Sequence, residues 1–302
     1  MAYDLIRINK LNALRDEIAL GVERIAYFRK EGDLGAASTE ADKVKKLIID
    51  VALADSASVV SRFYYELGYL EKAKGNHKQA ALEFDRSAAA AQVDNNIPSE
   101  VFGAMHAVQV RYMSEEIDAD AAIELTRDLQ RRLLEAHDEH KSGVLYLNVE
   151  ALLLKRLAEY LFDERNHEAV LMHELLMDHR QVEEWRQGGS MHYDLNRYQG
   201  LARSAEFGGN HDEAISHYVC FLDIKYLKEK YICPDEQVTP IPLTVVSRDE
   251  LIRDFVSLAR LLRFHRRDKE NANKVLNDAL SWGGEVIPPL FVRLINDERH
   301  LS

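Results

Sequence analysis

The sequence has too few cysteines for a fold that depends on disulfides or on thiolate-bound metal. It contains only Cys220 and Cys233 in 302 residues, and neither belongs to a Cys-x-x-Cys pair. Two separated thiols provide neither a disulfide framework nor a four-thiolate zinc site. We therefore expect a reduced compartment. Cys220 follows Tyr218 and Val219 in an apolar helical context, which predicts a core position.

Long apolar runs and an excess of positive charge are also absent. No stretch approaches the roughly 18 apolar residues of a membrane span, and residues 1–7 lack the basic and apolar regions of a signal peptide. The formal net charge is -12 at pH 7, which disfavours nucleic-acid phosphates and anionic lipid as partners. We expect a cytoplasmic protein that binds neither nucleic acid nor membrane.

Proline is scarce, and none of the six prolines falls between Pro98 and Pro234. Because proline inside a helix costs about 3 kcal/mol, this tract predicts continuous helical packing. The segment 231–247 contains Pro234, Pro240 and Pro242 and predicts an irregular loop. Such a loop either covers part of a groove or is a tolerated insertion. Residues 284–302, with Pro288 and Pro289, predict a short helix that caps the preceding array.

The chain repeats itself. Gly75-Asn76-His77 and Gly209-Asn210-His211 are each followed by an alanine, Ala80 or Ala214, and then by an aromatic residue, Phe84 or Tyr218. The intervals upstream also match: Ala80 is preceded at 16, 13 and 12 residues by Tyr64, Leu67 and Gly68, and Ala214 is preceded at the same intervals by Tyr198, Leu201 and Ala202. Weaker copies place Ala37, Ala122, Ala169 and Ala272 at the same position. In chain order, the spacings between the first five alanines, from Ala37 through Ala80, Ala122 and Ala169 to Ala214, are 43, 42, 47 and 45 residues.

This pattern resembles the tetratricopeptide repeat, a helical hairpin whose standard length is roughly 34 residues. The resemblance implies an all-α fold: a right-handed superhelix of about five to six antiparallel helical hairpins over residues 3–283, with a concave inner face. The small residues Gly68 and Ala80 would let two helices of a hairpin approach closely, and the large residues would fill the space between hairpins. The longer spacing predicts longer helices or connections.

Motifs for catalysis are missing. There is no GxxxxGK[ST], GxGxxG or GxSxG sequence. His173-Glu174 has Met177 where a zinc protease needs a second histidine, and His137 with His140 fits a polar helix end better than a metal site. His77, His167 and His211 recur at one position of the repeat, which indicates turn or capping roles. We expect no metal, no cofactor and no enzymatic activity.

A binding role is the leading hypothesis. In the repeats that this chain resembles, first-helix positions two, five and nine line the concave face, which here gives Arg62, Tyr65, Tyr69, Arg111, Asn196, Gln199 and Arg203. Their aromatic, amide and guanidinium groups suit peptide recognition, although the same positions are also compatible with ordinary half-exposed helix residues. A stripe of Arg260, Arg263 and Arg267 is a possible docking patch, or a solvated helix end paired with nearby acids.

These observations predict a non-catalytic scaffold, adaptor or regulatory subunit that holds a protein or peptide segment. One alternative is a peptide-responsive signalling regulator, which usually carries an effector region before its repeats; here repeat-like sequence begins within the first twenty residues, which favours the adaptor. Another is a metal-dependent enzyme using His137, His140 or His173, which bound metal would support. Partner identity and oligomeric state have no signature in the sequence.

Overall fold

The computed structural model describes residues 2–49, 57–137, 141, 143–187, 191–230, 252–283 and 287–300. Every regular element in these ranges is an α-helix, so the all-α prediction is confirmed. The predicted loop 231–247, Cys233 and His140 lie outside the described residues. The helices are α1 (Ala2–Lys30), α2 (Leu34–Ile49), α3 (Ala57–Ala73), α4 (His77–Val93), α5 (Ile97–Met113), α6 (Ala119–Leu134), α8 (Val144–Asp163), α9 (Glu168–Met177), α10 (Arg180–Gln187), α11 (Met191–Phe207), α12 (His211–Lys230), α14 (Ile252–Phe264), α15 (Lys269–Gly283) and α16 (Pro289–His300).

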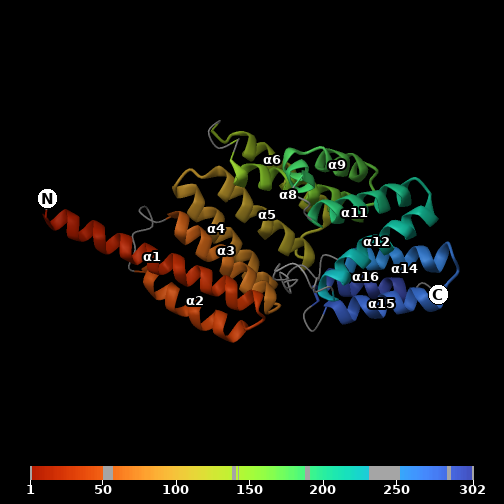
Figure 1. The fold of residues 1–302 in the computed structure, drawn as a ribbon, viewed down its shortest axis with the longest axis horizontal. Coiled ribbons are helices and arrows are strands. Elements are labelled where there is room, and N and C mark those ends of the chain that lie inside the picture. The colour runs from red at the N-terminus through yellow and green to blue at the C-terminus, as the bar shows by residue number, and fades with distance from the viewer. Residues whose placement is uncertain are drawn as a thin grey trace. The chain divides into compact units, whose positions relative to one another are not determined.

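Helices adjacent in the chain pack against each other, as the ribbon in Figure 1 shows for α3 with α4 and for α11 with α12. The chain divides into two compact units. Unit 1 comprises residues 1–111 and 128–149, and unit 2 comprises residues 112–127 and 150–302.

Glycine in the left-handed conformation forms three of the hairpin turns. Gly32, Gly75 and Gly209 have φ values of 81°, 81° and 76°. At Gly75, the glycine N–H donates to Lys72 O over 3.0 Å and the next N–H donates to Glu71 O over 2.9 Å, which is the Schellman arrangement. Each glycine precedes a repeat alanine by five residues, so the turns follow the predicted repeat.

The repeat alanines are all in the core. Ala37, Ala80, Ala122, Ala214 and Ala272 are fully buried, and Ala169 is 3% exposed. The predicted close approach at Gly68 is also confirmed, because a Cβ atom there would lie 2.7 Å from Cε1 of Phe84 on α4. A methyl group at this position would separate α3 from α4.

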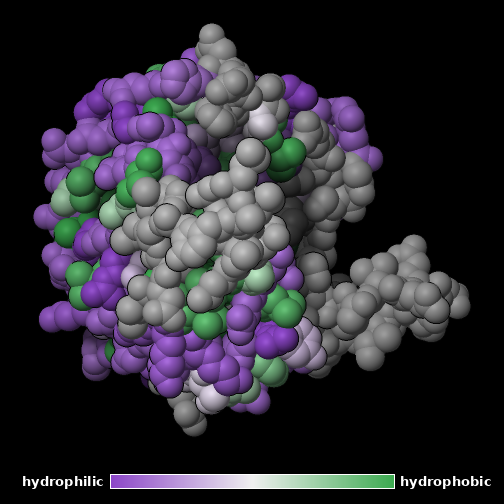
Figure 2. All heavy atoms as spheres, turned by 90° about the vertical axis from the view of Figure 1, so that its left-hand side faces the viewer, coloured by the Kyte–Doolittle hydropathy of each residue, from purple (hydrophilic) through white to green (hydrophobic). Residues whose placement is uncertain are grey.

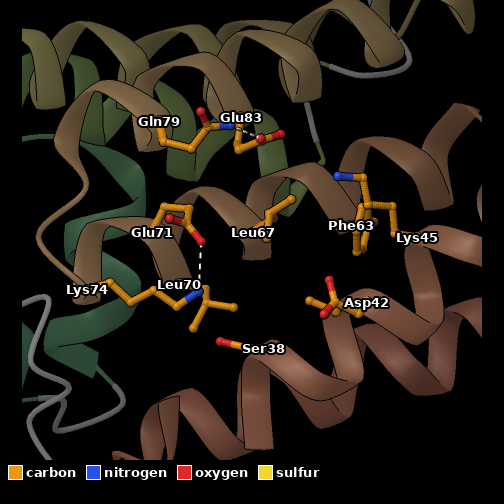
Figure 3. A pocket seen from close by; sticks show the side chains of 11 residues that line it. Ser38, Asp42, Lys45, Phe63, Leu67, Leu70, Glu71, Lys74, Gln79 and Glu83 are labelled. Carbon is orange, nitrogen blue, oxygen red and sulfur yellow. Dashed lines mark hydrogen bonds and ion pairs between the residues drawn. The ribbon is translucent and has the colours of Figure 1, made fainter. Parts of the chain in front are cut away.

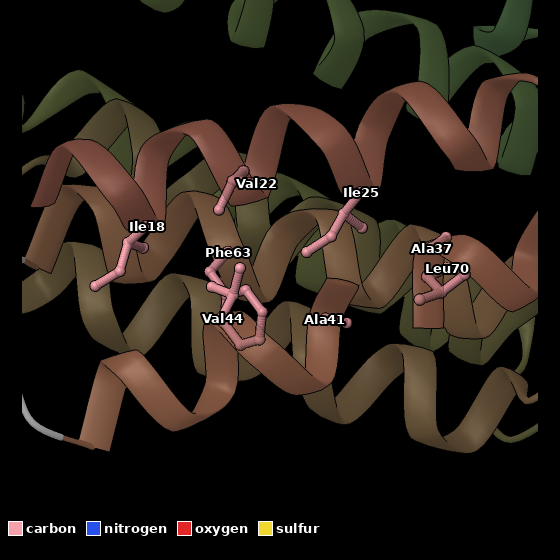
Figure 4. Packing of buried hydrophobic residues seen from close by; sticks show 8 residues of the cluster. All are labelled: Ile18, Val22, Ile25, Ala37, Ala41, Val44, Phe63 and Leu70. Carbon is pink, nitrogen blue, oxygen red and sulfur yellow. The ribbon is translucent and has the colours of Figure 1, made fainter. Parts of the chain in front are cut away.

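Each well-defined core joins both helices of a hairpin to the first helix of the next. In unit 1, Figure 4 shows Ile18, Val22 and Ile25 of α1 packed with Ala37, Ala41 and Val44 of α2 and with Phe63 and Leu70 of α3. In unit 2, Tyr218 of α12 packs with Ala202 of α11 and Leu258 of α14. A hairpin therefore completes its core only on its neighbour, as expected for helical repeats.

One local prediction was wrong. Cys220 is exposed, because α12 buries Tyr218 and Phe221 and directs the intervening positions outward. His77 and His211 are the first residues of α4 and α12, at the hairpin turns that the repeat predicted. Asp33 Oδ1 caps α2 by accepting from Ala36 N, and Asn166 Oδ1 accepts from Glu168 N of α9, whereas α4 begins after Asn76 without a side-chain cap. His167 stands at the start of α9 without a side-chain capping bond.

The predicted C-terminal helix is present as α16, which begins at Pro289. It buries Leu290, Phe291 and Ile295 and packs against α14 and α15. Proline suits this position because the first turn of a helix has no use for the missing N–H.

Candidate ligand-binding grooves

Two of the predicted first-helix residues meet in a ring cluster of unit 1. The Tyr65 hydroxyl donates to the Tyr69 hydroxyl over 3.1 Å, and His106 of α5 lies within 3.3 Å of the Tyr69 hydroxyl. Tyr65 also stacks on Phe102 with ring centroids 4.9 Å apart. Burial raises the pKa of Tyr65 well above its ordinary value of 10.0, so the phenol stays neutral. These rings hold α3 to α5; Tyr65, Tyr69 and Phe102 are half-buried and His106 is buried.

The corresponding residues of unit 2 are buried. Gln199 Nε2 donates to Asp254 Oδ2 over 2.7 Å, and the Arg203 guanidinium donates to Asp254 Oδ1 over 3.2 Å. Asp254 is fully buried, and burial raises its pKa even though Arg203 opposes the shift. Asn196 is 9% exposed, and its carbonyl accepts a hydrogen bond from His173. These groups join α11 to α9 and α14 and present little surface to a ligand.

The other two predicted residues of unit 1 are placed differently from each other. Arg62 is 55% exposed and lies 3.7 Å from Glu23 of α1. Arg111 pairs with Asp85 of α4, so it faces the preceding second helix. The structure thus brings Tyr65 and Tyr69 together, and separately brings Gln199 and Arg203 together. Whether these seven residues bind a ligand remains a prediction.

The arginine stripe on α14 is used within unit 2. Arg260 Nε lies 3.3 Å from Glu298 Oε2, and the buried Arg263 donates to the backbone carbonyl of Glu298 and, over 2.7 Å, to Asn273 Oδ1. Arg267 is exposed beyond the end of α14 with a φ of 55°. Arg260 and Arg263 therefore hold the chain's own α16, which matches the alternative of pairing with nearby acids.

The histidines considered for metal chemistry do not converge in the described part of the chain. No group of three or more His, Cys, Asp or Glu side chains there is arranged to hold a metal ion. His173 is 8% exposed, its Nε2 donates to Asn196 O over 2.8 Å, and burial with nearby Arg203 lowers its pKa to about 4. His173 is therefore neutral at pH 7, and His137 is exposed at the end of α6.

Unit 1 has a groove between the second helix of its first hairpin and the first helix of its second. The groove, of about 280 Å³, is lined by Ser38, Ala41, Asp42 and Lys45 of α2, by Phe63, Leu67, Leu70 and Glu71 of α3, and by Lys74, Gln79 and Glu83. Figure 3 shows Leu67 and Phe63 over the hollow, with Lys45 and Asp42 at one side and Lys74 with Glu71 at the other. An apolar floor thus has charges of both signs at its rim.

Unit 2 has a larger groove of about 420 Å³ between α9 and α11. We call it the α9–α11 groove. It is lined by Val170, His173, Glu174, Met177 and Asp178 on one side and by Tyr193, Arg197, Gly200, Leu201 and Ser204 on the other. His173 forms part of its floor, since the ring packs directly on Gly200.

The two grooves occupy the same position in the repeat. Ala37 and Ala169 are 132 residues apart, and the same interval separates Ser38 from Val170, Ala41 from His173, Asp42 from Glu174 and Lys45 from Met177. Ala80 and Ala214 are 134 residues apart, as are Phe63 and Arg197, Leu67 and Leu201, and Leu70 and Ser204. A surface that recurs at one register is a product of the repeat itself.

None of these groove residues is among the predicted binding residues, which stand at first-helix positions two, five and nine. The signal that could have located them is the set of polar or charged residues just after each repeat alanine, such as Asp42 after Ala37 and Glu174 after Ala169. Those residues belong to second helices, whose outer side we had not considered as a binding surface.

The described surface is mainly hydrophilic on the face drawn in Figure 2, where hydrophobic residues form small separate groups. Among the described residues, no helix is both long and apolar enough to cross a membrane. No protein-family model matches the chain, and no curated protein shows significant similarity to it.

Proposed function

We propose that this chain is a non-catalytic binding protein of the tetratricopeptide-repeat kind, which holds protein or peptide segments as a scaffold, adaptor or regulatory subunit. Its hairpins would continue one another in a right-handed superhelix. The observation that carries the proposal is the recurrence of a groove at one register in both units. Concave surfaces with an apolar floor and a polar rim are what extended or helical segments bind.

The chemistry of the grooves favours binding over catalysis. The histidine that approaches the α9–α11 groove, His173, is neutral at pH 7, and its Nε2 is already bonded to a backbone carbonyl. The groove of unit 1 contains lysines and carboxylates, of which Lys74 and Glu71 pair over 2.8 Å. In the same groove the Ser38 hydroxyl donates to the backbone carbonyl of Leu34 over 2.6 Å, a bond that occupies the proton a nucleophile would have to give to a base.

Site-specific photocrosslinking tests the proposal. A benzophenone amino acid is placed at Lys45, which lines the groove of unit 1, and at Leu201, which lines the α9–α11 groove. Matched controls are the exposed Lys46 on α2 and Val219 on α12, which line neither groove. Irradiation in extract of the cells that make the protein should give discrete adducts from the groove positions and none from the controls.

The pattern of adducts decides between the hypotheses. Equal adducts from Lys45 and Lys46 positions would contradict a groove-based binding function. Recovery of a partner cleaved or modified in a manner that requires this chain would contradict the non-catalytic part. Mass spectrometry of the adducts identifies the bound segment in either case.

A further inference from the structure

The α9–α11 groove has an unusually apolar border. Helix α9 has only two charged residues, Glu168 and Glu174, in its ten positions. It buries Ala169, His173 and Leu176, yet Leu171 and Leu175 on its outer side are 51% and 45% exposed. Leu201 on α11 is 38% exposed at the opposite wall. A helix that is apolar on both its inner and outer sides is expected to be covered on both.

Three charges surround this apolar surface, and none of them makes an ion pair within the described residues. Glu174 and Asp178 are four residues apart on the α9 wall, and Arg197 projects from the α11 wall. The Arg197 guanidinium carbon lies 5.9 Å from the centroid of the Tyr198 ring. Another exposed charge of unit 2, Arg127, pairs with Glu168 over 2.8 Å.

The groove floor contributes no charge at neutral pH. His173 is neutral because burial and Arg203 lower its pKa to about 4, and Gly200 has no side chain. The site therefore has an uncharged centre, an acidic wall and a basic wall. The chain as a whole carries a net charge of -12, so electrostatic attraction during encounter favours a basic partner.

We propose that the α9–α11 groove binds an amphipathic segment of a partner protein, whose apolar side chains pack on Met177, Leu175 and Leu201 and whose lysine or arginine pairs with Glu174 and Asp178. The inference rests on the proposed binding function and specifies its ligand. Arg197 faces the opposite flank of the segment and forms an ion pair with an acidic residue there. The opposed walls thus fix the direction in which the segment lies.

The test selects peptides from a phage-displayed random library on the full-length chain and measures their affinities by fluorescence anisotropy. We expect selected peptides to combine Leu, Ile, Met or Phe with a net positive charge. The double variant Glu174→Lys/Asp178→Lys should bind these peptides at least about tenfold more weakly, which corresponds to about 1.4 kcal/mol. Selection on that variant should instead yield acidic peptides.

Two controls separate local pairing from general effects. Glu164→Lys/Glu270→Lys makes the same change of net charge at exposed acids that line neither groove, and it should keep most of the affinity. Leu175→Gln/Leu201→Gln removes the apolar border without changing the charge and should also weaken binding at least about tenfold.

The outcomes distinguish this inference from the proposed function. If the wild-type chain selects no peptide family, both are overturned. If it selects peptides whose affinities are the same for the Glu174/Asp178 and Leu175/Leu201 variants as for wild type, the binding function stands and the α9–α11 groove is not its site. Equal weakening by the two charge-changing variants would overturn the assigned ion pairs.

Discussion

The imidazole of His173 occupies the space that a side chain at position 200 would need. A Cβ atom on Gly200 would lie 2.8 Å from Cε1 of His173 and closer still to Cδ2 and Nε2. The ring is fixed there by its hydrogen bond to Asn196 O, one turn before the glycine on α11. The floor of the α9–α11 groove therefore depends on the absence of a side chain at one position.

Gly200→Ala should destabilise the protein by about 1–3 kcal/mol, because the methyl group must displace a buried ring or separate α9 from α11. In the double variant His173→Ala/Gly200→Ala, the added methyl should cost little beyond the loss from His173→Ala itself. Urea unfolding, monitored by circular dichroism, measures the free energy of unfolding of the single and the double variant. Gly35→Ala is the control, since its Cβ would meet only Asp33 Oδ1 at 3.6 Å. Equal effects at positions 35 and 200 would contradict the packing.

The buried His173 should make stability depend on pH. Its pKa is about 4 in the folded chain against an ordinary value of 6.5, so the unfolded state binds more protons between these two values. Stability is then complete above pH 6.5 and decreases by about 3 kcal/mol as the pH falls toward 4. His173→Gln should lose less stability over this range in urea titrations at pH 7 and pH 4.5. A variant with the wild-type dependence would exclude His173 as the cause.

Arg203 and Asp254 form a buried pair with 4% and 0% side-chain exposure. Arg203→Ala should cost about 3–5 kcal/mol, because it leaves the Asp254 carboxylate buried with Gln199 as its remaining side-chain partner. In an Asp254→Asn background the same substitution should cost clearly less, since no buried charge is left. Thermal unfolding of the wild type, the two single variants Arg203→Ala and Asp254→Asn, and their double variant measures the coupling between these two residues. Arg62→Ala, at an exposed site, should change stability by less than about 0.5 kcal/mol.

Most of the fold could be predicted because its signals are local in sequence. Gly32, Gly75 and Gly209 mark turns that require a positive φ, and the buried alanines mark close helix contacts. The break between α9 and α10 was not predicted. Asp178 and His179 interrupt the second helix there, and His179 Nδ1 accepts from Gln181 N at the start of α10. Nothing in the apolar periodicity indicated that interruption.

The candidate site was harder to predict because its partners are distant in sequence. Gln199 and Asp254 are 55 residues apart, so the register of one helix could not show that this inner-face position was occupied from α14. The prediction that Cys220 is buried was wrong for a related reason. Residues 218–222 are apolar throughout, and only the packing of neighbouring helices decides that Tyr218 is covered while Val219 and Cys220 are not.

Glu298 should act as the anchor of α16. Its side chain is 1% exposed and lies beside Arg260 and Arg263 of α14. Glu298→Ala should increase hydrogen exchange across residues 289–300 by an amount equivalent to about 1–3 kcal/mol, because two arginines lose a buried acceptor. Asp297→Ala, at an exposed neighbouring position, is the control. Unchanged exchange in α16 of the Glu298 variant would return Arg260 and Arg263 to consideration as a docking patch.

Arg267 occupies the turn position that glycine holds in three other hairpins. It precedes Ala272 by five residues, as Gly75 precedes Ala80, and its φ is 55°. A residue with a Cβ atom pays about 1–2 kcal/mol for this conformation, partly offset by the greater freedom of glycine in the unfolded chain. Arg267→Gly should therefore stabilise the protein by about 0.5–1 kcal/mol in urea unfolding. Arg266→Gly should instead destabilise it, because Arg266 pairs with Asp212 at 2.8 Å. A destabilised Arg267→Gly chain would show that the arginine side chain itself holds this turn.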